Sequence, residues 1–189
     1  DKEYAATHTN SNGSVDIGKY QPNTVAQRNG MMEFAQNNNS LIAEGYKSAW
    51  DIQNRFSSDF LRFKSMVNNG LPDSKKLSTD QLIASYQMYN SPKLQEGYMD
   101  YLESSYIANK DRVKDAYAKK GITLNDHQAM YLIHNRGLGG ALQGREISDK
   151  LLSKLNFQQN QTVNTNFKWT FQRKEAEKEF DLVSPYTKK

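Results

Sequence analysis

The sequence predicts a mainly α-helical protein, and three observations lead to this fold class. Apolar residues recur at three- to four-residue spacing along much of residues 24–156, which is the periodicity of amphipathic helices. Capping residues, prolines and glycines separate these periodic stretches. Strand and helix patterns do not alternate along the chain as they do in a doubly wound sheet. The 189 residues suit one domain, or one domain with an appendage.

Boundary signals divide the helical part into separate elements. Ser78 is the predicted cap of one helix, and Pro92 behind Ser91 opens the next. Gly121 and Gly137 are predicted to end two others. The predicted helices span residues 24–36, 41–67, 79–89, 92–108, 110–120, 126–136 and 149–155.

The C-terminal part has a different pattern. From Val163 to Phe171, polar and apolar residues alternate, which predicts a strand or an extended arm. We therefore expect a helical domain over residues 1–156 and a C-terminal extension over 157–189. An exposed alternating strand can pair with another chain, so residues 161–172 are the predicted contact with a partner protein.

The composition narrows the classes of function. Cysteine is absent, which excludes disulfides, thiol catalysis and cysteine-ligated metals and suits an extracytoplasmic destination. The three histidines lack zinc-ligand spacing and no phosphate loop follows a strand, so we expect neither metal nor cofactor. The net charge of +4 suits a polyanion such as a cell-wall polymer, but the sequence lacks the dense basic motifs of nucleic-acid readers. No apolar run approaches the ~20 residues of a membrane span.

The first candidate functional stretch lies at the start of the chain. It begins with Glu3, continues through a polar run of turn-forming residues, and ends with Gly18-Lys19-Tyr20-Gln21. Gln21 lies eighteen positions after Glu3. A carboxyl group beside a polar, glycine-bearing wall can act as a general acid on a glycan. The alternative is a polar chain end without a function.

The second candidate stretch runs from Tyr131 to Ala141. It places Tyr131, His134 and Asn135 at a predicted helix end, directly before a glycine-rich turn. Such a turn lets a glycan approach the backbone closely. The alternative is a structural joint in which His134 and Asn135 cap the last carbonyls of the helix.

Together, the two stretches resemble the lysozyme-like superfamily, and most closely its lytic transglycosylases and related phage-type and secreted wall hydrolases. In that family a catalytic Glu is followed by a polar loop and a Gly-x-x-Gln cluster, which matches Glu3 and residues 18–21. Asn12 falls where an Asn is often found. The resemblance covers residues 3–143, in which residues 131–141 resemble a later motif of the family.

One departure from the family concerns the start of the chain. In the family, the catalytic Glu ends a helix that precedes it, whereas here only Asp1 and Lys2 precede Glu3. We therefore expect the support for this residue to come from elsewhere if Glu3 is the acid.

The resemblance implies a lysozyme-like helical domain that cleaves the β-1,4 bond between N-acetylmuramic acid and N-acetylglucosamine in peptidoglycan. Glu3 is then the catalytic acid. The implied substrate-binding residues are Tyr20, Gln21, Tyr131, His134 and Asn135. A lytic transglycosylase uses the one Glu as acid and then as base, whereas a hydrolytic muramidase often needs a second acid, for which Asp16 is the nearby candidate. We favour the transglycosylase because no second acid is obvious.

An alternative from another class is a non-catalytic lysozyme-like scaffold. Such a module would bind wall polymer or a partner protein, as a part of a phage tail or a secretion machine. The short segment before Glu3 and the C-terminal arm favour it. In each case the expected location is extracytoplasmic, which means the periplasm, the exterior or a phage particle.

Overall fold

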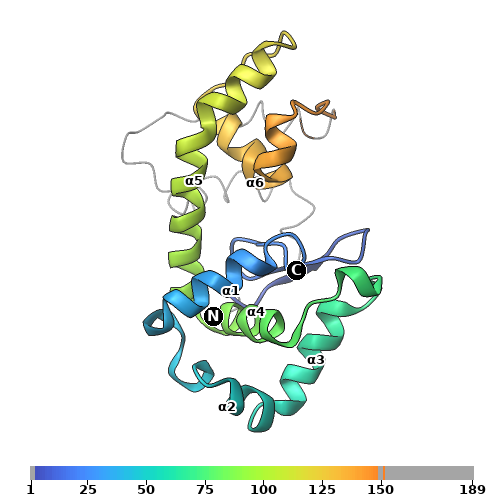
Figure 1. The fold of residues 1–189 in the computed structure, drawn as a ribbon, viewed down its shortest axis with the longest axis vertical. Helices are drawn as coiled ribbons and strands as arrows, with labels where there is room; N and C mark the ends of the chain where they lie inside the picture. The colour runs from blue at the N-terminus through green and yellow to red at the C-terminus, as the bar shows by residue number, and fades with distance from the viewer. Residues whose placement is uncertain (1–2, 149–150, 152–189) are drawn as a thin grey trace. The chain divides into compact units, whose positions relative to one another are not determined.

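The computed structural model describes residues 3–148 and 151. Within this part the mainly α-helical fold class is confirmed (Figure 1). The predicted extension over 157–189, with the arm at 161–172, lies outside the described residues, as does most of the predicted helix 149–155. The chain divides into two compact units, Asp1–Met99 and Asp100–Lys189, which are described separately.

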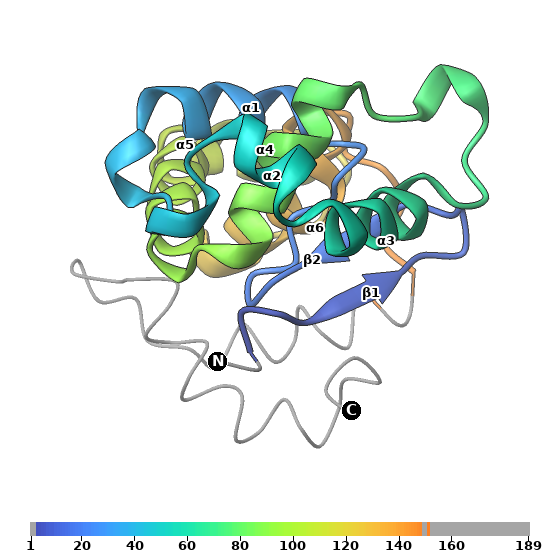
Figure 2. The same cartoon turned by 90° about the horizontal axis from the view of Figure 1, so that it is seen from below.

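The first unit begins with a β-hairpin that the sequence patterns did not predict. Strands β1 (Thr7–Thr9) and β2 (Val15–Ile17) pair antiparallel, and Figure 2 shows them side by side. The strands are short and β1 is polar, so only buried Val15 and Ile17 show the two-residue period of a strand. The hairpin turn requires Gly13, whose φ is +82°.

Helices α1 (Arg28–Asn37) and α4 (Thr79–Asn90) pack against each other in the first unit (Figure 1). Helix α4 confirms the predicted cap, because Ser78 Oγ accepts from the Gln81 N–H and Gln81 Oε1 accepts from the Ser78 N–H. The core of this unit is apolar and includes Val15, Ile17, Met31, Ile52, Val67, Leu82, Met88 and Leu94.

The prediction of one helix over 41–67 is wrong. The chain instead forms η1 (Asn39–Leu41), η2 (Glu44–Tyr46), α2 (Ala49–Asn54) and α3 (Ser57–Asn68). The ring of Tyr46 stacks on that of Phe56, with centroids 5.0 Å apart. In one continuous helix these residues would lie about 15 Å apart along the axis. The chain between Tyr46 and Phe56 therefore folds back on itself, and the stacked rings lie at its two ends. Ser48 caps α2 within this segment.

Helix α5 (Pro92–Ala118) joins two predicted helices into one. No proline or glycine lies between the predicted ends at residues 108 and 110. Asn109 does not interrupt the helix, because its side-chain amide donates to the backbone carbonyl of Ser105 one turn earlier. No helix of the described residues is long and apolar enough to cross a membrane.

The second unit contains the remainder of α5 and helix α6 (Asp126–Leu142). Asn125 caps α6 through reciprocal 2.8 Å hydrogen bonds with Gln128. Gly137, predicted as the end of this helix, does interrupt it, with φ 69° and ψ 159°. The predicted turn after Gly137 is wrong, because the chain becomes helical again and continues to Leu142. The core of this unit includes Val113, Tyr117, Ala129, Leu132, Ile133 and Ala141.

Candidate functional site

Glu3 lies exposed in a turn that precedes β1. The segment that follows it is held by two side chains of the first unit. Gln95 Nε2 donates to the Tyr4 carbonyl at 2.8 Å, and the Tyr89 hydroxyl donates to the Ala5 carbonyl at 2.9 Å. The segment that carries Glu3 is thus held through the residues after it, while Glu3 itself is exposed.

The Gly18–Gln21 segment forms a tight turn after β2. Gly18 has φ +69°, and Gln21 has φ +53°, which makes Gln21 the one non-glycine residue with positive φ in the described part of the chain. Gln21 Nε2 donates to the Gly18 carbonyl at 2.6 Å and closes the turn. Such conformations are costly for residues with a side chain and cluster at functional sites. The hydrogen bond from its own side chain to Gly18 helps to hold Gln21 in this conformation.

Gln95 joins three segments around this turn. Its Oε1 accepts from the Lys19 N–H at 3.0 Å, and its Nε2 donates to the carbonyls of Tyr4 and Met88 at 2.8 and 2.9 Å. The side chain is buried, with the residue 2% exposed. Gln95 was not predicted as a site residue. Its only local signal is an amide directly after the apolar Leu94 in the helix predicted over residues 92–108.

Glu96 is a second residue of this site that no sequence pattern predicted. The Tyr20 hydroxyl donates to its Oε2 at 2.6 Å, and the Tyr4 hydroxyl donates to its Oε1. Lys19 Nζ lies 3.3 Å from the same Oε1. It also lies 5.1 Å from the ring centroid of Tyr4 and 5.3 Å from that of Tyr20, within reach of cation–π attraction. The two ends of the first motif therefore meet on one carboxylate.

The charges of Lys19 and Glu96 stabilise each other. Burial raises the pKa of Glu96, but hydrogen bonds from Tyr20 and Tyr4 and the charge of Lys19 outweigh it, so this pKa lies below its usual value. Burial lowers the pKa of Lys19, but Tyr4 and Glu96 outweigh it and the pKa is raised. Glu96 is thus ionised at neutral pH and is not a proton donor there.

Asp16, the candidate second acid, is part of the hairpin structure. Its Oδ1 accepts from Asn23 Nδ2 at 2.8 Å and from Asn10 Nδ2 at 3.0 Å. Burial raises the pKa of Asp16, and the two amides act against this rise. Asn12, at the position where the family often has Asn, accepts from the Ser14 N–H and hydroxyl inside the turn. These residues shape the polar loop.

The residues of the second motif lie in the second unit and differ in access. Tyr131 is 7% exposed and belongs to the core, whereas Asn135 is exposed. His134 is half-buried, and its Nδ1 lies 3.1 Å from the Tyr106 hydroxyl, with the two rings edge to face. His134 and Asn135 are therefore the accessible members of this motif.

Arg136 organises the joint that follows these residues. Its guanidinium donates to the backbone carbonyls of Arg145 and Glu146, each at 2.7 Å, and to the Tyr117 hydroxyl at 3.0 Å. These bonds come from Arg136 and reach carbonyls beyond α6, so they are not the predicted capping of the last helix carbonyls by His134 and Asn135. At Gly137 a Cβ would have no atom within 4 Å, so the backbone is open at the interruption of α6.

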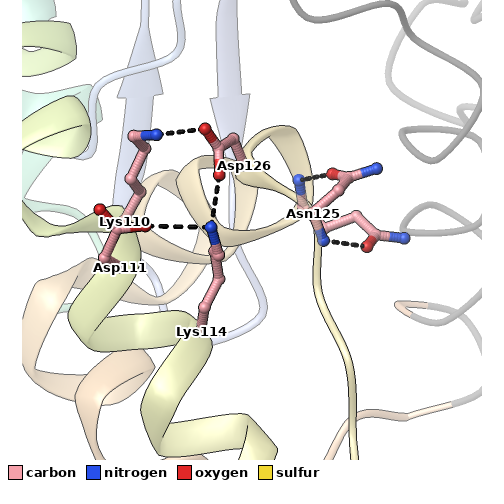
Figure 3. A network of polar contacts seen from close by, with 6 residues as sticks. Lys110, Asp111, Lys114, Asn125 and Asp126 are labelled. Atoms are coloured by element: carbon pink, nitrogen blue, oxygen red, sulfur yellow. Dashed lines mark hydrogen bonds and ion pairs between the residues drawn. The ribbon is translucent and has the colours of Figure 1, made fainter.

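A charged network joins the start of α6 to the part of α5 that lies in the second unit (Figure 3). Both carboxylate oxygens of Asp126 are used, Oδ2 by Lys110 and Oδ1 by Lys114 at 2.7 Å. Hydrogen bonds from Lys110 and then Lys114 lower the pKa of Asp126. Among the residues that the structure describes, no three His, Cys, Asp or Glu side chains form a group that could hold a metal ion.

The geometry brings the first motif together around Gln95 and Glu96 and places the second motif at the interruption of α6. No protein-family model, no curated protein and no solved structure matches this chain. Its function is therefore inferred from these residues and their chemistry.

Proposed function

We propose that this chain has a lysozyme-like domain and cleaves the MurNAc-β-1,4-GlcNAc bond of peptidoglycan as a lytic transglycosylase, with Glu3 as its single catalytic acid. The observation that carries the proposal is the closure of the first motif on Glu96. Tyr4, beside Glu3, and Tyr20, beside Gln21, both donate hydrogen bonds to that carboxylate. This closure supports the proposal, because one carboxylate holds both the residue after Glu3 and the residue before Gln21, and catalysis depends on such fixed positions.

The proposed reaction uses one carboxyl group twice. The proton of Glu3 passes to the glycosidic oxygen as the bond from that oxygen to the muramyl C1 breaks. The resulting carboxylate then removes the proton of the muramyl 6-hydroxyl, whose oxygen bonds to C1 and gives a 1,6-anhydro product. Glu96 is ionised and Asp16 is bound by two amides within the hairpin, so the proposal assigns this role to Glu3.

The substrate-binding residues divide into two kinds. Gln21, His134 and Asn135 are at least partly exposed and are proposed to contact N-acetyl groups and sugar hydroxyls. Tyr20 and Tyr131 are 3% and 7% exposed, and each is proposed to support the accessible residues of its own motif from inside the fold. Since peptidoglycan is an extracytoplasmic polymer, the chain would act in the periplasm, outside the cell or from a phage particle, and residues 161–172 are proposed to contact a partner protein.

A non-catalytic wall-binding module is the second candidate, and the exposure of Glu3 favours it. General acids of glycosidases commonly lie in surroundings from which water is partly excluded. An exposed carboxyl group with the same polar loop would serve a domain that binds glycan strands without cleaving them.

Mass spectrometry of the products from purified peptidoglycan tests these candidates. The wild-type chain should release anhydro-muropeptides, and Glu3→Gln should release none. Glu33→Gln is the matched control, because Glu33 is an exposed glutamate on α1, and it should digest at the wild-type rate. Products with reducing ends would assign a hydrolytic muramidase, and binding without products would assign the module. Full activity in Glu3→Gln would remove Glu3 from the mechanism.

A further inference from the structure

An acidic side chain that belongs to neither candidate motif contacts both ends of the first motif. Glu96 lies near the start of α5, and both of its oxygens are used: Oε1 by Tyr4 and Lys19, and Oε2 by Tyr20. The side chain of Lys19 is only 5% exposed, so its charge depends on the ion pair with Glu96, whose own side chain is 37% exposed. These contacts join the segment before β1 to the segment after β2.

We infer that Glu96 is a positioning residue for the acid Glu3, and this inference rests on the proposed function. Tyr4 directly follows Glu3, and the bond from its hydroxyl to Glu96 fixes the side chain next to the acid. The Tyr4 carbonyl is held at the same time by Gln95. Contacts at both ends of Tyr4 therefore set where the chain presents Glu3.

A carboxylate suits this position better than an amide of the same shape. It offers acceptor oxygens to both phenols and a negative charge to the buried Lys19. Glutamine would present one acceptor oxygen and one donor group, and it would remove the counter-charge of Lys19. The Tyr4 ring would then lose the partner that orients it. A misplacement of the acid by about 1 Å is enough to reduce catalysis by about 100-fold.

Steady-state kinetics of muropeptide release by the full chain tests the inference. We expect Glu96→Gln to lower kcat by about 10- to 100-fold while KM changes by less than about threefold. Tyr4→Phe should lower kcat in the same direction, and the double variant should be no worse than Glu96→Gln alone, because both act through one contact. Glu33→Gln serves as the control and should leave both constants unchanged.

Hydrogen exchange provides a readout that does not depend on activity. In Glu96→Gln, the amides of residues 4–9 should exchange at least about tenfold faster than in the wild type, while those of α1 keep their rates. If circular dichroism shows that Glu96→Gln does not fold, Tyr4→Phe carries the same comparison, because it removes the bonds of the Tyr4 hydroxyl to Glu96 and Lys19 and leaves the Lys19–Glu96 ion pair in place.

The outcomes separate the two proposals. If the wild type is active and Glu3→Gln is not, a Glu96→Gln kcat within about twofold of the wild type overturns the positioning role. A raised KM at unchanged kcat also overturns it, since it would assign Glu96 to substrate binding. If the wild type releases no product, the proposed function fails, and with it the role in catalysis. Exchange at residues 4–9 then still decides whether Glu96 holds this segment.

Discussion

Gln95 Oε1 accepts a hydrogen bond from the backbone N–H of Lys19 at 3.0 Å, and this contact leaves no room for a side chain on the preceding residue. A Cβ at Gly18 would lie 2.1 Å from the same oxygen. The other end of the Gln95 amide is held by the Tyr4 and Met88 carbonyls. Glycine at position 18 and glutamine at position 95 therefore depend on each other.

Gly18→Ala should destabilise the protein strongly. Gln95 cannot move away from the new methyl group without breaking its hydrogen bonds, and the φ of +69° is itself unfavourable for alanine. We expect a loss of about 2–5 kcal/mol in the free energy of unfolding, measured by urea denaturation. Gly70→Ala is the matched control, because Gly70 has the same φ but no atom within 4 Å of its Cβ, and it should lose only about 1–2 kcal/mol. Equal losses in the two variants would contradict the clash.

Gln95→Met keeps the length of the side chain and removes its amide. The Lys19 N–H and the Tyr4 and Met88 carbonyls then lose their partner, and we expect a loss of about 2–4 kcal/mol in the free energy of unfolding. Gln53→Met, on the exposed side of α2, should change stability by less than about 0.5 kcal/mol. A similar small change at position 95 would show that the buried amide is replaceable.

Two glycines of α6 should respond to alanine with opposite signs. Gly137 has φ 69° and ψ 159°, a region that residues with a Cβ avoid, so Gly137→Ala should lose about 1–3 kcal/mol although the space around it is open. Gly139 lies in the helical part that follows, also with open space, and Gly139→Ala should gain about 0.5–1 kcal/mol. Thermal unfolding of both variants measures the difference. A stabilised Gly137→Ala would mean that α6 is continuous in solution.

The Asp126 network should contribute stability that acid removes. Its pKa in the folded protein is lowered from the reference of 3.8 by Lys110 and Lys114, so the contribution is present above about pH 4 and is lost as the pH falls through the folded pKa. Asp126→Asn should therefore cost about 1 kcal/mol at pH 7 and nothing once Asp126 is protonated. Urea denaturation at several pH values measures the gap. A gap that persists at the lowest pH would trace the loss to capping geometry.

Asp16 should show the opposite dependence. Burial raises its pKa above 3.8 in the folded state, so the stability that it contributes is present below 3.8 and is lost as the pH rises through the raised pKa. Asp16→Asn should therefore compare more favourably with the wild type at pH 7 than at pH 3. The same denaturation series checks this change, and a dependence like that of Asp126 would rule it out.

The elements predicted from the sequence are those with local causes. Ser78 and Asn125 cap their helices through partners three residues away, so their signals lie within one turn of sequence. The continuous helix over 41–67 was a wrong prediction because the Tyr46–Phe56 stack and the packing around it override the apolar spacing. The β1–β2 hairpin was not predicted because β1 is polar and shows no alternation of polar and apolar residues.

The sequence predicted site residues that lie close together along the chain, but not those that contact them from distant positions. Glu3 and Gln21 were found through their spacing in one stretch. Gln95 and Glu96 were missed because their contacts reach residues 76 to 92 positions away, which no periodicity records. The positive φ of Gln21 was also invisible, since glutamine carries no preference for that conformation.

The bond between Tyr4 and Glu96 spans 92 positions, and this separation sets an order of events during synthesis. A ribosome adds about 5–20 residues per second, so the N-terminal segment waits roughly 5–20 s for the helix that secures it. Strands β1 and β2 can pair within microseconds in that interval, because a hairpin needs only its own residues. The acid-bearing segment therefore stays unsecured on the nascent chain until α5 has emerged, and its final placement belongs to the late stage of folding.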